Sequence, residues 1–308
     1  MHLFKKYKII WMFLFLIICF LIFFNKDIPL ATFKSIENNK VLNEDLNGDG
    51  NKDAIYIKTN DNEYLIQINL NNKGSLSLNP NSKIKTLGEH KNYWPIKVTF
   101  KDISRDNCKE IFLQSSFNET PIQHMFLFDG EKYVNALSEK YNIIGFLDSS
   151  NGKTPKIISG NFKNVDSILN SYILVDNTLK KFDYSYPNNY IGNELITDFL
   201  SFIESFPNDD VIIPKYFNEK LSGDTLTNVY KLAYNETKYI FQDGFFEDIS
   251  YDDKGNPIEL RWVLNFKGLK NNNYDDMKNY TIELILSRSI INDNNYNYNI
   301  TSLDINSF

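Results

Sequence analysis

The chain has 308 residues, enough for two domains, and its apolar content of 42%, with 24 Phe and 19 Tyr, indicates a packed interior rich in β structure. Its 39 acidic residues outnumber the 33 basic ones and give a formal net charge of −6, which argues against nucleic-acid binding because that requires a basic face. Cys19 and Cys108 are far apart in the sequence, so no intramolecular disulfide is expected.

The first predicted element is a membrane helix. A lysine-rich start, MHLFKKYK, precedes residues 9–24, the uncharged apolar run IIWMFLFLIICFLIFF. As a helix this run spans about 24 Å, and flanking polar residues can make up the difference from a hydrocarbon core of about 30 Å. Because no small-residue cleavage site follows Phe24, an uncleaved anchor is favoured over a cleaved signal peptide, with lipidation at Cys19 a third alternative. Residues 1–26 therefore predict a single-pass cell-membrane protein whose bulk is extracytoplasmic.

Residues 45–53, DLNGDGNKD, have the pattern of a calcium-binding loop, because calcium takes about six to eight oxygen ligands that a tight loop supplies from alternate positions. Gly50 at position 6 permits the positive φ that wraps the chain around an ion. The loop is not an EF-hand, since position 12 is Tyr56 and a strand-like run follows. An Asx-rich turn without metal is the alternative. The candidate ligands at positions 1, 3, 5, 7 and 9 are Asp45, Asn47, Asp49, Asn51 (through its backbone carbonyl) and Asp53.

Two later stretches keep the same frame, DISRDNCKEIFL from Asp102 and DSSNGKTPKIIS from Asp148. The spacings of 57 and 46 residues lie near the roughly 40–50 residues of a propeller blade. In the last stretch Lys156 stands where a carboxylate belongs, so metal binding is not expected there. The middle stretch offers weaker candidate ligands: Asp102, Ser104, Asp106, Cys108 (through its carbonyl) and Glu110.

These units resemble the FG-GAP or VCBS repeat family, whose blades carry a calcium loop of the form D-x-[DN]-x-D-G-x-x-D. The resemblance covers about residues 33–185 and is most specific at residues 45–53. It implies that the residues named in the first two loops are ligands of a structural Ca²⁺ ion. Because a propeller needs at least about four blades, three such units imply a partial propeller, a compact β-sandwich of repeats, or a ring closed by a partner chain.

The pattern changes after the turn-rich stretch at residues 185–194. Apolar residues then recur at helical spacing from Leu195 to Phe206, and a weaker helical pattern covers Asp224–Tyr234. Four strand-like runs follow from Lys238, the first two joined by a hairpin signal. Residues 192–308 therefore predict a small α+β domain with an antiparallel sheet, similar in outline to nuclear-transport-factor-like or cystatin-like folds. The predicted fold class is mainly β: a transmembrane helix, three propeller-blade-like repeats, then this α+β domain.

No catalytic motif of the nucleophile-elbow, Walker, dinucleotide-binding or C-x-x-C type is present, and His90 and His124 are expected at the surface or in turns. The preferred hypothesis is a non-enzymatic, membrane-anchored bacterial protein whose calcium-stabilised β-repeat scaffold binds an unknown protein or glycan partner. One alternative, a glycan- or cell-wall-binding adhesin, requires solvent-facing aromatic residues. The other, a hydrolase, requires carboxylates that converge in a pocket of the C-terminal domain. Aromatic candidates such as Trp94, Trp262, Tyr296 and Tyr298 are expected to pack within strands instead.

Overall fold

A computed structural model describes residues 32–36, 40–71, 74–149, 151–162, 168–183, 190–218, 221–289 and 297–307. The predicted membrane segment, residues 1–26, lies outside this set. Within the set, no helix combines the length and the apolar character needed to cross a bilayer.

The described residues are mainly β structure, as the sequence predicts, with two helices at the expected places. The strands are β1 (Thr32–Ile36), β2 (Lys40–Glu44), β3 (Asp53–Asn60), β4 (Glu63–Leu70), β5 (Gly74–Ser77), β6 (Ile96–Lys101), β7 (Glu110–Phe117), β8 (Thr120–Phe128), β9 (Tyr133–Glu139), β10 (Ile143–Leu147), β11 (Lys156–Asn161), β12 (Ile168–Val175), β13 (Thr178–Phe182), β14 (Thr237–Tyr251), β15 (Pro257–Lys270), β16 (Met277–Arg288) and β17 (Tyr298–Ser307). The helices are α2 (Asn193–Glu204) and α3 (Gly223–Ala233).

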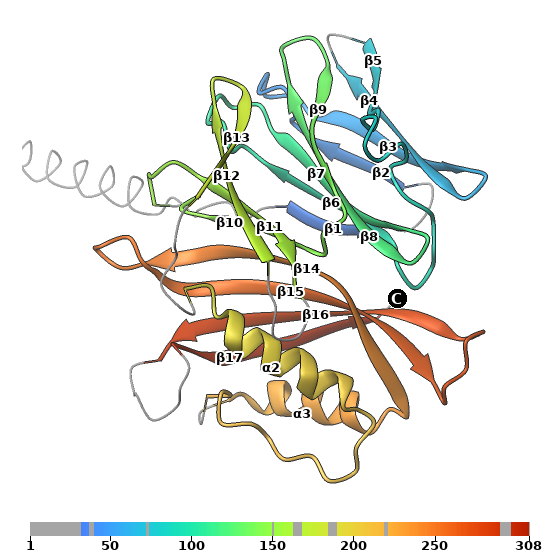
Figure 1. Cartoon of the computed structure of the whole chain (residues 1–308), viewed down its shortest axis with the longest axis vertical. Helices are drawn as coiled ribbons and strands as arrows, with labels where there is room; N and C mark the ends of the chain where they lie inside the picture. The colour runs from blue at the N-terminus through green and yellow to red at the C-terminus, as the bar shows by residue number, and fades with distance from the viewer. Residues whose placement is uncertain are drawn as a thin grey trace, which may run out of the picture. The chain divides into compact units, whose positions relative to one another are not determined.

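Four antiparallel meanders of four consecutive strands make up the sheets (Figure 1). We call them the first to fourth units: β2–β5, β6–β9, β10–β13 and β14–β17. The first unit is a sheet of its own, and β1 adds to the second unit by antiparallel pairing with β6. The third and fourth units share one eight-stranded sheet, because β10 and β14 pair in parallel.

The shared sheet runs across the domain boundary that the sequence suggests between residues 33–185 and 192–308. The parallel pairing extends from Ile143 opposite Gly244 to Phe146 opposite Glu247. The contacts also group Ala31–Phe308 as one unit. Strands from both sides of the suggested boundary are therefore hydrogen-bonded neighbours.

Both helices pack on the fourth unit and bury its face (Figure 1). Helix α2 buries Leu195, Ile196, Phe199, Leu200 and Ile203 at the spacing of one helical face. Helix α3 begins at Ser222, whose side chain accepts the Thr225 N–H and so caps the first turn. These helix side chains share one core with Trp262 and other apolar residues of β15, β16 and β17.

A buried polar contact joins β6 of the second unit to β14 of the fourth. The Lys97 ammonium lies 2.7 Å from Asp243 Oδ2, and both side chains are almost completely buried. Trp94 Nε1 donates to the same oxygen at 2.6 Å, and Asn265 Nδ2 donates to Asp243 Oδ1 at 2.8 Å. Burial lowers the pKa of Lys97 and Asp243 opposes that change. A buried charge of this kind is tolerable only when paired and hydrogen-bonded, so this contact constrains how β6 and β14 pack.

His124 lies buried in β8, whereas the sequence suggests a surface or turn position. Its Nδ1 is 2.7 Å from Ser138 Oγ, and its Nε2 has no partner among the described residues. Burial lowers the pKa of His124 to about 4. The folded state therefore holds the imidazole neutral in a range where the unfolded chain would protonate it.

His124 should make stability depend on pH. Its pKa in an unfolded chain is about 6.5, so the unfolded state binds the extra proton first and the stability is lost as the pH falls from about 6.5 toward 4. We expect His124→Gln to remove about 2–3 kcal/mol of the decrease in unfolding free energy between pH 7 and pH 4.5. Guanidinium unfolding at both pH values measures this. An equal decrease in the variant and the wild type would contradict the assignment.

Candidate functional site

An acidic turn joins the first and second strands of every unit. The turns are residues 45–53 between β2 and β3, 102–110 between β6 and β7, 148–156 between β10 and β11, and 252–256 between β14 and β15. We number them first to fourth. Sequence reasoning finds the first three as repeats. It identifies the fourth only as a hairpin, although its Asp-Asp-Lys-Gly-Asn sequence stands at the same place in its unit.

In the first turn the backbone wraps around one carboxylate. Asp45 accepts the Gly48 N–H on Oδ1 and the Gly50 N–H on Oδ2, both at 2.9 Å. Both glycines have positive φ, 71° and 84° respectively, which glycine adopts without strain. Asn47 and Asp49 each accept the N–H of the residue two positions further on, in Asx-turn geometry.

Asp53, the last predicted ligand, closes this turn from its other end. Its side chain is fully buried. Its Oδ2 accepts the Leu46 N–H at 2.9 Å, and its Oδ1 accepts the Asn71 N–H at 3.1 Å. Each carboxylate oxygen keeps a second lone pair. Asp53 thus ties the start of the turn to the end of β4.

The second turn repeats these bonds. Asp102 accepts the Arg105 N–H at 2.6 Å and the Asn107 N–H at 3.1 Å, from the positions that the two glycines hold in the first turn. Arg105 and Asn107 also have positive φ, 62° and 68°, an uncommon conformation for residues with a side chain. Glu110 Oε2 accepts the Ile103 N–H at 2.6 Å, as Asp53 accepts that of Leu46. The two turns are therefore one backbone motif, with acidic residues at the same positions in the same roles.

The remaining predicted ligands of the second turn lie close by. Ser104 Oγ donates to Asp102 Oδ1 at 3.3 Å, and Asp106 accepts the Cys108 N–H at 2.8 Å. Burial raises the pKa of Glu110 to about 7. Burial and the neighbouring acids raise the pKa of the Cys108 thiol to about 11, which leaves it unreactive as a nucleophile.

The first and second turns also touch each other. The Cys108 thiol lies 3.4 Å from the Asn47 carbonyl, and the Lys109 N–H donates to the Leu46 carbonyl at 2.9 Å. A Cβ at Gly48 would stand 2.7 Å from the carbonyl oxygen of Asn107, so this position requires glycine for packing as well as for φ. The two candidate loops are thus a contiguous pair.

The third turn contains a cation of its own. The Lys156 ammonium contacts the Asp148 carboxylate, at the position where the first two turns have their last acid. A second carboxylate comes from β14: Asp248 accepts the Asp148 N–H at 3.0 Å and the Ser149 hydroxyl at 3.1 Å. Burial lowers the pKa of Lys156 and raises that of Asp248. Lysine thus supplies the positive charge in this turn.

The fourth turn is also paired with a cation. Asp252 Oδ2 accepts from Arg288 Nη1 at 2.9 Å, while its Oδ1 accepts the Lys254 and Asn256 N–H groups. By contrast, Asp45, Asp53 and Asp102 make no ion pair with any lysine, arginine or histidine that the structure describes. The acids of the first two turns are stabilised by backbone N–H groups.

The donor chemistry of the first two turns fits calcium, which prefers carboxylate and carbonyl oxygens in a flexible loop. Across the described ranges, no group of three or more Asp, Glu, His or Cys side chains converges closely enough to form a preformed metal cluster. The acids Asp45 and Asp53 direct their oxygens to N–H groups instead. Calcium binding therefore stays a prediction, which rests on the oxygen-donor side chains of these loops and on their alternate spacing.

The aromatic and carboxylate residues that glycan binding or hydrolysis would need do not lie in the turns' ligand positions. Trp262 and Tyr298 are buried in strands, as expected. Trp94 is also buried but lies in the turn before β6, and Tyr296 lies outside the described residues. Two adjacent carboxylates of β14 do not converge on a pocket: Glu247 is paired with Lys101 and Arg261, and Asp248 accepts hydrogen bonds from the third turn.

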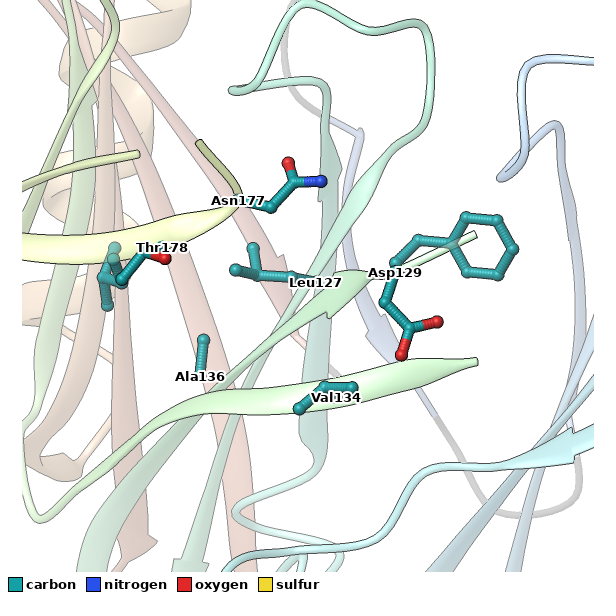
Figure 2. A pocket seen from close by; sticks show the side chains of 8 residues that line it. Leu127, Asp129, Val134, Ala136, Asn177 and Thr178 are labelled. Carbon is teal, nitrogen blue, oxygen red and sulfur yellow. The ribbon is translucent and has the colours of Figure 1, made fainter. Parts of the chain in front are cut away.

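Two cavities stand out in the described structure. One of about 380 Å³ lies between the β8–β9 and β12–β13 hairpins, where Figure 2 shows Leu127, Val134 and Ala136 near Asn177 and Thr178. Its one acidic residue is Asp129. The other, of about 780 Å³, lies between α3 and the strands of the fourth unit, and no carboxylate lines it. Neither cavity brings together the two carboxylates that the hydrolase alternative requires.

Comparison of the chain with protein-family models, curated proteins and solved structures finds no match. The resemblance to FG-GAP or VCBS repeats therefore rests on the residues of the turns themselves.

The cation of the third turn can be tested by substitution. Lys156→Met would leave the buried Asp148 without its ion-pair partner, so we expect the unfolding free energy to fall by roughly 2–4 kcal/mol at pH 7.5. The loss should be smaller at pH 5, because burial already raises the pKa of Asp248 and favours its protonation.

Urea unfolding measures both values. Lys83→Met, which removes the surface ion pair with Glu139, is the matched control and should cost no more than about 1 kcal/mol. If the two substitutions cost the same, Lys156 has no special role in the turn.

Proposed function

We propose that this chain is a non-enzymatic binding protein, anchored in the cell membrane by residues 1–26, with its bulk outside the cytoplasm. Its repeat units would be blades of the FG-GAP or VCBS type, stabilised by calcium at Asp45–Asp53 and more weakly at Asp102–Glu110. The helices and the fourth unit would present the surface that binds a partner. The apolar run at residues 9–24 supports the membrane anchor, and the resemblance supports the blade assignment.

One observation carries the calcium proposal: all four units place an acidic turn between their first two strands, and in the third and fourth turns the leading aspartate, Asp148 or Asp252, is ion-paired with a lysine or arginine. Lys156 and Arg288 neutralise the third and fourth turns. The first turn has the richest set of oxygen donors and the second repeats its backbone bonds. A bound Ca²⁺ ion would supply there the positive charge that side chains supply in the other two turns.

Calcium in this role would be structural. It would neutralise the acids of the turn and hold its two ends together, with an affinity in the ~10⁻⁴–10⁻³ M range of extracellular modules. Residues Asp45, Asn47, Asp49 and Asp53 would hold the ion with side-chain oxygens, and Asn51 with its carbonyl. The scaffold would then be most stable in the calcium-rich medium outside the cell.

Calcium should raise the melting temperature of the full-length chain. For the affinities above, 10 mM CaCl₂ stabilises by about 1–3 kcal/mol, which corresponds to a rise in melting temperature of roughly 2–5 °C for a chain of this size. We expect Asp45→Asn to lose at least half of this rise. Asp129→Asn, which alters an exposed acid that accepts the Glu131 and Lys132 N–H groups outside the four turns, should keep all of it.

Circular dichroism melts in EDTA, 10 mM MgCl₂ and 10 mM CaCl₂ measure these shifts. A wild-type chain that melts at one temperature in all three solutions would overturn the calcium part of the proposal.

A further inference from the structure

We propose that the cleft between α3 and the fourth unit binds an oligosaccharide; this inference rests on the proposed binding function but not on calcium. The cleft has a volume of about 780 Å³ and is open to solvent. Such a volume suits a small ligand or a short segment of a chain of sugars. Its wall on the helix side comes from α3 and the residues just after it, and its other walls come from β14, β16 and β17. The lining residues are Thr227, Asn228, Tyr230, Lys231, Leu232, Tyr234, Asn235, Tyr239, Tyr280 and Ile305.

Aromatic surface is the main feature of the cleft. Tyr230 of α3 and Tyr234, the C-cap residue of this helix, are four positions apart, and their rings lie nearly parallel, with centroids 5.8 Å apart and an angle of 9° between the planes. They are 38% and 52% exposed. Behind them, the buried Tyr239 packs edge-to-face against the half-buried Tyr280 at 5.1 Å and forms the floor of the cleft. Elsewhere in the described chain, the large exposed aromatic residue is Tyr274, in the turn between β15 and β16.

Polar groups that lack a partner accompany these rings. Asn228 is held by a bond from its Nδ2 to the Leu303 carbonyl at 3.0 Å, which leaves its Oδ1 available as an acceptor. The hydroxyls of Tyr230 and Tyr234 and the Lys231 ammonium make no hydrogen bond or ion pair with any residue that the structure describes. The cleft thus offers donors and an acceptor at the edges of exposed aromatic faces.

This combination matches the surface of a sugar ring, which has an apolar C–H face bordered by hydroxyl groups. The C–H face packs on an aromatic ring, while the hydroxyls bond to amide, phenol and ammonium groups. With one lysine and no acid in the lining, the cleft lacks the basic surface that nucleic acid requires and the paired carboxylates that glycoside hydrolysis requires. The chemistry indicates binding without cleavage.

A peptide added as an extra strand fits less well, because the neighbouring edge of the sheet is already occupied. On β17, Ile300 exchanges backbone bonds with Tyr216 and Asn218 at 2.8 and 2.9 Å. Leu303 donates its N–H to Thr225 Oγ1 at 3.4 Å, and its carbonyl accepts from Asn228. Strand addition needs a free row of such groups. The geometry therefore favours a saccharide over a peptide strand.

Titration calorimetry of the full-length chain in detergent, with cellohexaose, maltohexaose, chitohexaose and solubilised peptidoglycan fragments as probes, tests the proposal. We expect at least one probe to bind, and the double variant Tyr230→Ala/Tyr234→Ala to weaken that binding roughly tenfold or more. Tyr230→Phe/Tyr234→Phe should retain most of it, since the rings remain. Tyr274→Ala, which removes an exposed tyrosine elsewhere, should bind as the wild type does.

Unchanged melting temperatures would show that the variants are folded, as expected for exposed side chains. Absence of binding by every probe, or equal weakening by Tyr274→Ala, would overturn the proposal. So would capture of peptides from a random decapeptide library by the wild type and not by the double variant, because that outcome assigns the cleft to a protein partner. The calcium response separates the two proposals: if the wild-type chain binds no saccharide but its melting temperature still rises with CaCl₂, only the cleft proposal is overturned.

Discussion

Acidic side chains gathered in a tight turn repel one another, and the fold must offset that repulsion at the same place in every unit. Backbone N–H groups provide part of the compensation, as the paired bonds to Asp45 and Asp102 show. In the third and fourth turns, Lys156 and Arg288 provide the rest. Residues with positive φ recur in these turns because the backbone must fold back for its N–H groups to reach the carboxylate.

Contacts between units hold the turns and the cleft in one framework. The first two turns touch, and Arg105 of the second turn donates to the Gly152 and Lys153 carbonyls of the third. Lys153 in turn donates to the carbonyl of Gly255 in the fourth. The parallel pairing of β10 with β14 extends this row into the sheet that carries the tyrosine-lined cleft. A rigid scaffold with a binding surface on its last unit is the division of roles that we propose.

Local patterns were the most predictable features. The alternating acids of residues 45–53 locate the first turn, and the apolar spacing after residue 192 locates α2. Features that depend on distant partners could not be predicted. The sequence shows that Lys156 replaces the last acid of the third turn. It does not show that Asp248, from a strand about 90 residues later, contacts the same turn. The parallel pairing of β10 with β14 and the burial of His124 escaped prediction for the same reason. The four strands after Lys238 were predicted as an antiparallel sheet, but not as a fourth unit of the same kind as the first three. The cleft was missed because Tyr230 and Tyr234 fit an ordinary helical pattern.

The central claim, that calcium provides for the first turn what Lys156 provides for the third, is tested most directly by calorimetric titration of the full-length chain with CaCl₂. The account predicts saturable binding with a dissociation constant of ~10⁻⁴–10⁻³ M, and removal of the tightest site by Asp49→Ala. Wild-type calcium binding that Asp49→Ala leaves unchanged, or no binding at all, would contradict it.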